Sequence, residues 1–461
     1  MEQCAIGVYG LGVMGKSLAM NFIRHGFPTS LYSKSEPERN SFSCPEQENW
    51  TLCQDEATFV ASLKRPRIVF LMITAGKPVD SVLDALLPLL EEGDTVIDGG
   101  NSYFEDTKRR CARTERSGVA FLGLGVSGGE KGALEGPCMM AGGSIAGWKA
   151  SSTLLQAIAA KAPDGAPCCA YVGPEGAGHY VKMVHNGIEY AIMQQLADLY
   201  GLMRDGMGMS AGTIADVFRS WQKGVLNSYL VDITIRVLEK QDADGGPLID
   251  RILDVARQKG TGCWSVLEAA RRGVYVPCID EALFTRYHSE QRAMRTRGAA
   301  VLPHTPVACP VPTVLQLQNA LYLAIICSYS QGIALIGKAS EEFHWDIDLA
   351  LAVSLWRNGC IIRSDLLGVI TASLRHGERQ LLFTEGLGDL RVMEAGLRAV
   401  SIYAVATGTA APALSAAMLY YDQCCSARMN VNLVQGLRDC FGAHTYERLD
   451  RAGSFHTAWE D

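Results

Sequence analysis

Residues 5–15 read Ala-Ile-Gly-Val-Tyr-Gly-Leu-Gly-Val-Met-Gly, a short apolar run that leads directly into glycines spaced as Gly-x-Gly-x-x-Gly. The run predicts a buried strand, and a helical pattern begins near Lys16. In this context the first glycine permits the turn, the second admits a pyrophosphate and the third lets the helix pack on the strand. The segment therefore predicts a dinucleotide site formed by Gly10, Leu11, Gly12, Val13, Met14 and Gly15.

Strand patterns alternate with helical ones over residues 1–177, as at 30–32, 68–72, 95–98 and 119–122. This alternation predicts βαβ units and a mainly parallel sheet, so we expect a Rossmann-type α/β domain. Helical patterns dominate the next region, 178–435, which predicts a large all-α domain, with helices at 178–205, 211–225, 317–338 and 346–358. Residues 436–461 show little apolar periodicity and are expected to form an extended C-terminal tail.

Composition narrows the classes of partner. The 461 residues exceed the size of one core, and a formal charge of -7 offers no basic field for nucleic acid or an anionic membrane. No long uninterrupted apolar run and no basic leader are apparent, so a cytoplasmic protein is expected. The 15 cysteines are scattered without a Cys-x-x-Cys pair, which indicates reduced, buried thiols and no metal site.

The end of the second predicted strand bears on the choice of coenzyme. A carboxylate there reads the ribose hydroxyl of NAD, but this chain has Ser33, Lys34 and Ser35. A lysine flanked by two hydroxyls suits a 2′-phosphate, so NADP is predicted, although Lys34 as a solvated surface lysine is the alternative. We also expect cofactor contacts from Ile73, Thr74, Ala75 and Asn101.

A polar stripe occurs within the apolar helical segment 178–205. Helical spacing places five side chains on one face of this helix: Lys182, His185, Asn186, Glu189 and Tyr190. A solvated face is the ordinary explanation, but the flanking residues are almost all apolar. A base, an acid and polar donors on a buried helix indicate a pocket.

These motifs resemble those of the 6-phosphogluconate dehydrogenases over nearly the whole chain. The resemblance rests on residues 10–15, 98–102 (Asp-Gly-Gly-Asn-Ser), 125–130 (Gly-Val-Ser-Gly-Gly-Glu), 182–190 (Lys-Met-Val-His-Asn-Gly-Ile-Glu-Tyr), 258–262 (Gln-Lys-Gly-Thr-Gly), 356–363 (Trp-Arg-Asn-Gly-Cys-Ile-Ile-Arg) and 438–446 (Arg-Asp-Cys-Phe-Gly-Ala-His-Thr-Tyr). It implies oxidative decarboxylation of 6-phosphogluconate to ribulose 5-phosphate and carbon dioxide, with reduction of NADP, in the oxidative pentose phosphate pathway. It also implies a homodimer whose tail reaches the partner's active site.

The resemblance assigns roles to individual residues. Lys182 is implied as the general base and later acid, and Glu189 as the acid that protonates the enediol. The substrate ligands it implies are Asn101, Ser127, Gly128, Gly129, His185 and Asn186 at the reacting end, and Tyr190, Lys259 and Arg286 at the phosphate, joined by Arg438 and His444 of the other subunit.

The chain departs from the family at several positions. Ser33-Lys34-Ser35 replaces a usual Asn-Arg-Thr, Thr74 and Cys263 replace lysines, and Leu134-Glu135 replaces a more basic pair. The first change keeps a positive charge, but those at positions 74, 134, 135 and 263 remove positive charge, so a catalytically silent NADP-binding paralogue stays open. A shorter, non-decarboxylating β-hydroxyacid dehydrogenase is the other alternative, and the tail argues against it.

Overall fold

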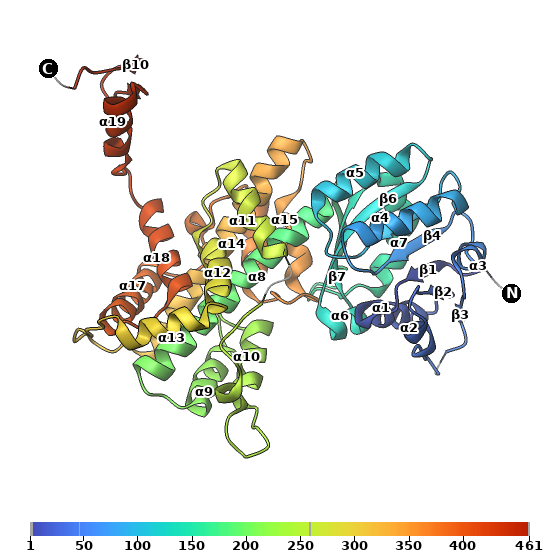
Figure 1. Cartoon of the computed structure of the whole chain (residues 1–461), viewed down its shortest axis with the longest axis horizontal. Helices are drawn as coiled ribbons and strands as arrows, with labels where there is room; N and C mark the ends of the chain where they lie inside the picture. Colours follow the sequence, from blue (N-terminus) through green and yellow to red (C-terminus); the bar gives the residue numbers. More distant parts are fainter. Residues whose placement is uncertain (1–2, 46, 258–259, 460–461) are drawn as a thin grey trace. The chain divides into compact units, whose positions relative to one another are not determined.

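The computed structural model describes residues 3–45, 47–257 and 260–459. The chain separates into two compact units, Met1–Ala417 and Met418–Asp461. The first unit contains an α/β domain, drawn in blue and cyan, and an all-helical domain, drawn from green to orange (Figure 1). This arrangement confirms the predicted fold class for the body of the chain.

In the described part of the α/β domain, eight strands form one sheet in the order β3-β2-β1-β4-β5-β6-β7-β8. All neighbours are parallel except β6 and β7, which pair antiparallel. The strands are β1 (Ile6–Tyr9), β2 (Thr29–Tyr32), β3 (Trp50–Leu52), β4 (Ile68–Leu71), β5 (Thr95–Asp98), β6 (Ala120–Ser127), β7 (Cys138–Gly143) and β8 (Cys169–Gly173). Strands β1, β2, β4 and β5 are buried along their whole length, as expected for a parallel sheet covered on both faces.

The covering helices leave two apolar cores, one on each face of the sheet. Phe22, Leu18 and Phe70 belong to one core, and Phe59, Val69 and Leu83 to the other. The helices are α1 (Val13–Arg24), α2 (Glu36–Asn40), α3 (Glu56–Ala61), α4 (Lys77–Leu86), α5 (Phe104–Glu115), α6 (Gly129–Glu135) and α7 (Ile145–Ile158).

The turn between β1 and α1 depends on its last glycine. A Cβ atom on Gly15 would lie 1.9 Å from the carbonyl oxygen of Gly10, so a larger residue would push α1 away from the strand. The motif therefore has the packing role that its spacing predicts.

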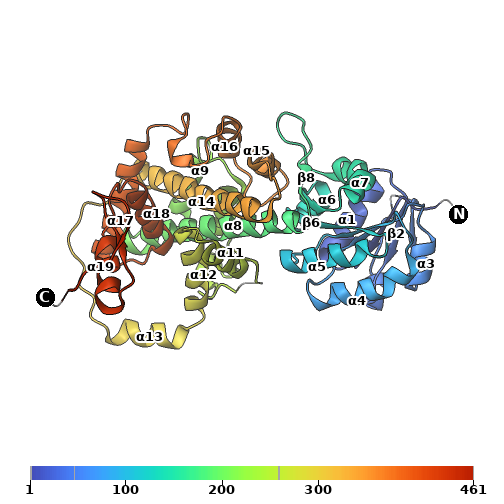
Figure 2. The same cartoon turned by 90° about the horizontal axis from the view of Figure 1, so that it is seen from above.

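The all-helical domain is built around α8 (Ala177–Gly201) and α14 (Val314–Phe343), which lie side by side (Figure 2). The other helices are α9 (Ala211–Trp221), α10 (Tyr229–Glu239), α11 (Thr261–Arg272), α12 (Pro277–Ser289), α13 (Arg292–Val301), α15 (Leu349–Ser354), α16 (Leu366–Arg375), α17 (Leu390–Thr407) and α18 (Pro412–Cys424). Helix α14 is long and apolar enough to cross a membrane, but 89% of its most apolar window is buried inside the protein. It is therefore the core helix of this domain.

The second unit contains α19 (Val431–Gly442) and a short antiparallel hairpin of β9 (Tyr446–Glu447) and β10 (Ser454–Phe455). Asp439 holds it together, because its carboxylate accepts hydrogen bonds from Thr445 N at 2.9 Å and Trp459 Nε1 at 2.8 Å. One buried carboxylate, and not an apolar core, is thus the organising contact of these residues.

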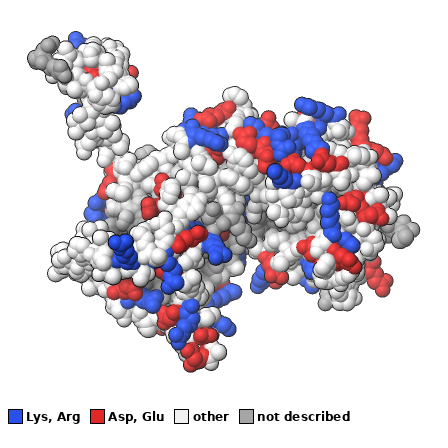
Figure 3. Space-filling view, in the orientation of Figure 1, with Lys and Arg blue, Asp and Glu red and all other residues white. Residues whose placement is uncertain are grey.

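Charged side chains of both signs are interspersed on the face shown in Figure 3. Over α4 and α5, for example, Arg109 forms ion pairs with Asp80 and Asp106 at 3.0 and 3.1 Å. This face therefore presents paired charges and no continuous basic field.

Candidate functional site

A cavity of about 840 Å³ lies where the carboxyl ends of β4, β5 and β6 meet the helical domain. The sheet contributes the loop residues Ile73–Gly76, Asn101 and Ser127–Gly129, and the helices contribute Lys182 and Glu189 from α8. The remaining lining residues include Asn186, Tyr190, Met193, Arg257, Thr261, Trp264 and Arg286. Ligands of α/β sheets bind at this end of the strands, so the fold places the site where its topology predicts.

A second hollow, of about 780 Å³, lies along the glycine turn. It shares Met14, Ile73 and Thr74 with the first, so the two hollows adjoin each other. Its other lining residues include Gly10, Gly12, Val13, Gly15, Ser33, Lys34 and Ser35, all predicted from the sequence. Ala75 and Asn101 line the first cavity instead, and the side chain of Leu11 is fully buried in the core.

The glycine turn fits a dinucleotide. Gly12 precedes α1 and no side chain caps the helix, so the first N–H groups are open to an anion. A Cβ atom on Gly12 would have one neighbour within 4 Å, Oε1 of Glu38 at 3.7 Å. A phosphate can therefore approach the backbone at this point.

The predicted stripe exists, and its five members come from α8. Lys182 is buried, and its Nζ lies 3.4 Å from Nδ1 of His185. The same Nδ1 lies 3.9 Å from Oε2 of Glu189, and Nε2 of His185 lies 3.4 Å from Oγ of Ser127. His185 is fully buried, and its ring contacts Lys182 on one side and Ser127 on the other.

Close contact with the sheet fixes the position of Lys182. A Cβ atom on Gly125 of β6 would lie 2.4 Å from Cβ of Lys182. On the opposite side of the helix, Oγ of Ser265 in α11 donates a hydrogen bond of 2.9 Å to the carbonyl oxygen of Met183. The lysine is thus held between the two domains of the first unit by packing rather than by a loop.

Burial shifts the pKa values of the titratable side chains in the stripe. It lowers the pKa of Lys182, although the carboxylate of Glu189 opposes this shift. Burial raises the pKa of Glu189, with Lys182 and Arg286 opposing. The pKa of His185 falls well below its ordinary value, first through burial and then through the charge of Lys182, so its imidazole is neutral. A lysine made easier to deprotonate and a carboxyl made easier to protonate form an acid–base pair.

Cationic groups gather at the far end of the stripe. The guanidinium of Arg286 lies 3.5 Å from the ring centre of Tyr190 and donates to the carbonyl oxygen of Arg257 at 3.4 Å. Lys259 lies outside the described residues. Arg438 and His444 belong to the second unit, where Arg438 donates a hydrogen bond of 3.0 Å to Oε1 of Gln435.

Several lining residues were missed by sequence reasoning. Thr261 lies within the stretch 258–262 that the resemblance had already marked, Arg257 and Trp264 flank that stretch, and Tyr103 follows the marked stretch 98–102. Their proximity in sequence to those motifs was the available signal. Glu38, which lines the coenzyme hollow, was missed as well.

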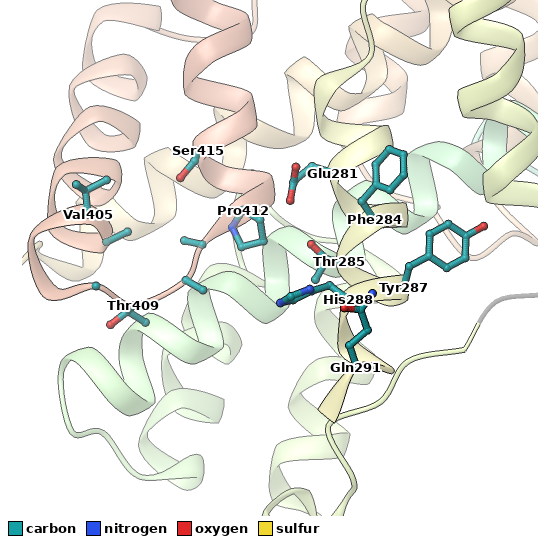
Figure 4. Close-up of a pocket in the computed structure, with 14 residues that line it drawn as sticks. Glu281, Phe284, Thr285, Tyr287, His288, Gln291, Val405, Thr409, Pro412 and Ser415 are labelled. Atoms are coloured by element: carbon teal, nitrogen blue, oxygen red, sulfur yellow. The ribbon is translucent and has the colours of Figure 1, made fainter. Parts of the chain in front are cut away.

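A separate hollow of about 810 Å³ lies between α12 and the turn from α17 to α18 (Figure 4). Glu281 and His288 of α12 face it, and Val405 and Pro412 form part of the other side. None of the described residues lining it is a lysine or arginine. A phosphorylated acid requires such groups, so the cavity beside α8 is the better substrate site.

Comparison with known proteins covers the chain from end to end. A model described as the NAD binding domain of 6-phosphogluconate dehydrogenase matches residues 5–173, and one described as the 6-phosphogluconate dehydrogenase C-terminal domain matches residues 178–459. The decarboxylating 6-phosphogluconate dehydrogenase of Chlamydia pneumoniae is 44% identical over 469 residues, covering 99% of this chain and 98% of that protein.

Two further relatives bear on the coenzyme. The NAD-dependent decarboxylating 6-phosphogluconate dehydrogenase of Bacillus subtilis is 42% identical over 466 residues, covering 99% of each chain. The solved structure of Plasmodium falciparum 6-phosphogluconate dehydrogenase, studied in its apo form and with NADP or 6-phosphogluconate, has a TM-score of 0.94 and 35% identity, and covers 99% of this chain and 100% of its own. Relatives of comparable similarity are thus described with either coenzyme.

Proposed function

This chain belongs to the 6-phosphogluconate dehydrogenase family, and we propose that it converts 6-phosphogluconate to ribulose 5-phosphate and carbon dioxide in the oxidative pentose phosphate pathway, with NADP as hydride acceptor. The observation that carries the proposal is the stripe on α8, where a buried lysine and a partly buried carboxyl face a cavity that adjoins the dinucleotide hollow. A base, an acid and a coenzyme site in one cavity are what this reaction requires.

The cavity has a binding group for each end of the substrate. The open backbone of Ser127, Gly128 and Gly129 suits the carboxylate, and Asn101 and Asn186 suit the neighbouring hydroxyls. Tyr190, Arg257 and Arg286 at the other end suit the phosphate, with Lys259 as the further cation that the resemblance implies. The sugar acid is thereby laid along the stripe with C3 near Lys182.

Lys182 begins the reaction in its neutral form, which burial favours. It takes the proton of the C3 hydroxyl while the hydride on C3 leaves, and the nicotinamide, when bound, supplies the acceptor for that hydride. C3 becomes a ketone β to the carboxylate, and Lys182 now carries the proton.

Loss of carbon dioxide then needs only proton transfers. The electrons of the C1–C2 bond move toward the C3 oxygen, which takes the proton back from Lys182 to give an enediol. Glu189, whose pKa is raised by burial, protonates the carbon that lost carbon dioxide, while Lys182 removes the hydroxyl proton of the enediol to form the ketose. A proton passed from Lys182 to Glu189 restores the starting state.

The choice of NADP rests on Ser33, Lys34 and Ser35, which line the hollow at the end of β2. Two hydroxyls and one ammonium group suit the oxygens of a 2′-phosphate.

Homodimerisation with exchange of the tail is the quaternary arrangement we propose, with the substrate site completed by the partner's Arg438 and His444. It is supported by exposed apolar side chains on both units, such as Val405 and Leu315 on the first and Leu437 and Phe441 on the second.

We propose domain boundaries after residues 177 and 435. In the described residues none of the 15 cysteines forms a disulfide, which suits a reducing compartment, so we propose the cytoplasm.

The assay that tests the reaction is absorbance at 340 nm with 6-phosphogluconate and either coenzyme, together with measurement of released carbon dioxide. The wild type should form both products and Lys182→Ala neither, while Lys108→Ala, a change on α5 away from the cavity, should be active. Reduced coenzyme without carbon dioxide would indicate the non-decarboxylating alternative. No turnover with either coenzyme would indicate the silent paralogue.

Mixed dimers test exchange of the tail. Lys182→Ala subunits supply an intact tail, and Arg438→Ala subunits supply an intact cavity. If tails are exchanged, mixing the two inactive variants restores one active site per mixed dimer. If each tail serves its own subunit, the mixture has no more activity than its parts.

A further inference from the structure

Glu38 joins the end of β2 to the glycine turn. It lies on α2, and its Oε2 accepts hydrogen bonds from Oγ of Ser33 at 2.6 Å and from the backbone N–H of Leu11 at 3.3 Å. Both Ser33 and Glu38 line the coenzyme hollow. The carboxylate thus lies between the pyrophosphate turn and the strand end that reads the adenosine ribose in dinucleotide-binding domains.

The local sequence gives Glu38 a different role. Ser35 begins α2 and accepts a hydrogen bond from Glu38 N at 3.4 Å, so Ser35-x-x-Glu38 has the pattern of a capping box. In a capping box the glutamate returns to the backbone N–H of the serine. Here that N–H donates instead to Oγ of Ser33 at 3.3 Å, and the carboxylate of Glu38 is directed to Leu11 and Ser33.

The surrounding charges do not offset this carboxylate. Lys34, the cation expected to hold a 2′-phosphate, is paired with Glu56 at 3.7 Å. Arg39 donates to the carbonyl oxygen of Ser33 and lies over the ring of Tyr32 at 5.9 Å. Each of the two cations is therefore already engaged, and Glu38 adds a negative charge beside the site.

We infer that Glu38 sets the coenzyme preference of this enzyme, by receiving the ribose 2′-hydroxyl of NAD and opposing the 2′-phosphate of NADP, so that NAD is used alongside NADP. The inference rests on the proposed function. A 2′-hydroxyl donates directly to a carboxylate. A 2′-phosphate carries about -1.5 to -2 charges, so it binds here only when the carboxylate leaves Ser33 and Leu11.

Glu38→Gln tests the inference, with Glu36→Gln as the matched control. Glu36 is an exposed acid on the same short helix, two residues from Glu38. We would measure kcat/KM for NADP and NAD at saturating 6-phosphogluconate, and by calorimetry the Kd of 2′,5′-ADP and of 5′-AMP, which differ in the 2′-phosphate.

The wild type should use the two coenzymes with kcat/KM values within about tenfold of each other. Glu38→Gln should raise the NADP:NAD ratio about tenfold, the change expected when one charge is removed about 5 Å from a phosphate dianion in a medium as polar as water. The gain should appear in KM for NADP and in a tighter Kd for 2′,5′-ADP, with 5′-AMP binding no tighter. Glu36→Gln should leave the ratio within twofold of the wild type.

Two results would overturn the inference. One is that Glu38→Gln keeps the NADP:NAD ratio of kcat/KM within twofold of the wild type, with a Kd for 2′,5′-ADP that is also within twofold. The other is an equal shift in Glu36→Gln, which would assign the effect to the general field of α2. If no coenzyme is reduced by the wild type, the proposed function fails, and the Kd values still decide the role of Glu38.

Discussion

Replacing Gly125 by alanine should displace Lys182, the proposed general base, without altering any polar group. Gly125 lies on β6, where a Cβ atom would be 2.4 Å from Cβ and 3.0 Å from Cγ of Lys182. The carbonyl oxygen of Gly178 would also be 3.0 Å away. Because backbone and Cβ atoms lie on both sides of the contact, rotation of the lysine side chain cannot relieve it.

The size of the effect follows from these distances. Ordinary contact begins at 3.4 Å, so α8 and β6 must separate by about 1 Å. Overpacking of this kind destabilises a core by about 1–3 kcal/mol. A displacement of about 1 Å at a reacting group lowers kcat by about 100-fold, because the near-attack geometry is lost.

The assay is steady-state turnover at 340 nm, with the Kd of the coenzyme and the thermal midpoint measured beside it. Gly125→Ala should keep the coenzyme Kd, because the glycine turn is not touched. Gly201→Ala is the matched control: it lies on the same helix with φ -60° and has no heavy atom within 4 Å of its Cβ position. It should keep kcat and stabilise α8 by up to about 1 kcal/mol. A folded Gly125→Ala enzyme with kcat within threefold of the wild type would refute the reasoning.

Three further predictions concern charged groups. The pH profile of kcat/KM should be bell-shaped, because Lys182 must lose a proton and Glu189 must hold one, and Glu189→Gln should remove one limb of the bell. Arg286→Met should raise KM for 6-phosphogluconate about 10- to 100-fold, the effect of one charge-assisted hydrogen bond, with a smaller change in kcat. Burial opposes ionisation of Asp439, but hydrogen bonds from His456 and neighbouring groups lower its pKa to about 2. Its contribution to the fold of residues 418–461 is therefore present above the ordinary carboxyl pKa and lost as pH falls toward 2, and limited proteolysis at pH 7 should cleave this unit faster in Asp439→Asn.

The sequence correctly predicted those features that depend only on a pattern of neighbouring residues. The glycine turn and the stripe on α8 each lie within one segment, so spacing alone placed Gly15 and Lys182 correctly. Helix ends were less accurate: the helix predicted over 346–358 is limited to α15, Leu349–Ser354, followed by a single 3-10 turn. There Arg357 pairs with Asp164 at 2.8 Å, and such a tertiary contact has no signature in the helical period.

Glu38 shows a second limit. Its carboxylate accepts a hydrogen bond from the backbone of Leu11, 27 residues away in sequence, and the local pattern gives no sign of that contact. His185 shows the same limit in another form. Its place in the stripe does not reveal its contact with Ser127 of β6, 58 residues away in sequence.

The arrangement around α8 also gives a reason for the proposed base, Lys182, and the proposed acid, Glu189, to occur on one helix. The contact of Gly125 with Lys182 fixes the upstream part of the helix against the sheet that carries the glycine turn, and Ser265 fixes the next turn to α11. Glu189 follows two turns after Lys182, toward the guanidinium of Arg286. A rigid helix therefore sets three separations at once: coenzyme to base, base to acid and acid to phosphate group. Because the separations are set by packing, small changes at the contacts with α8 should alter catalysis more than changes of charge at the rim of the cavity.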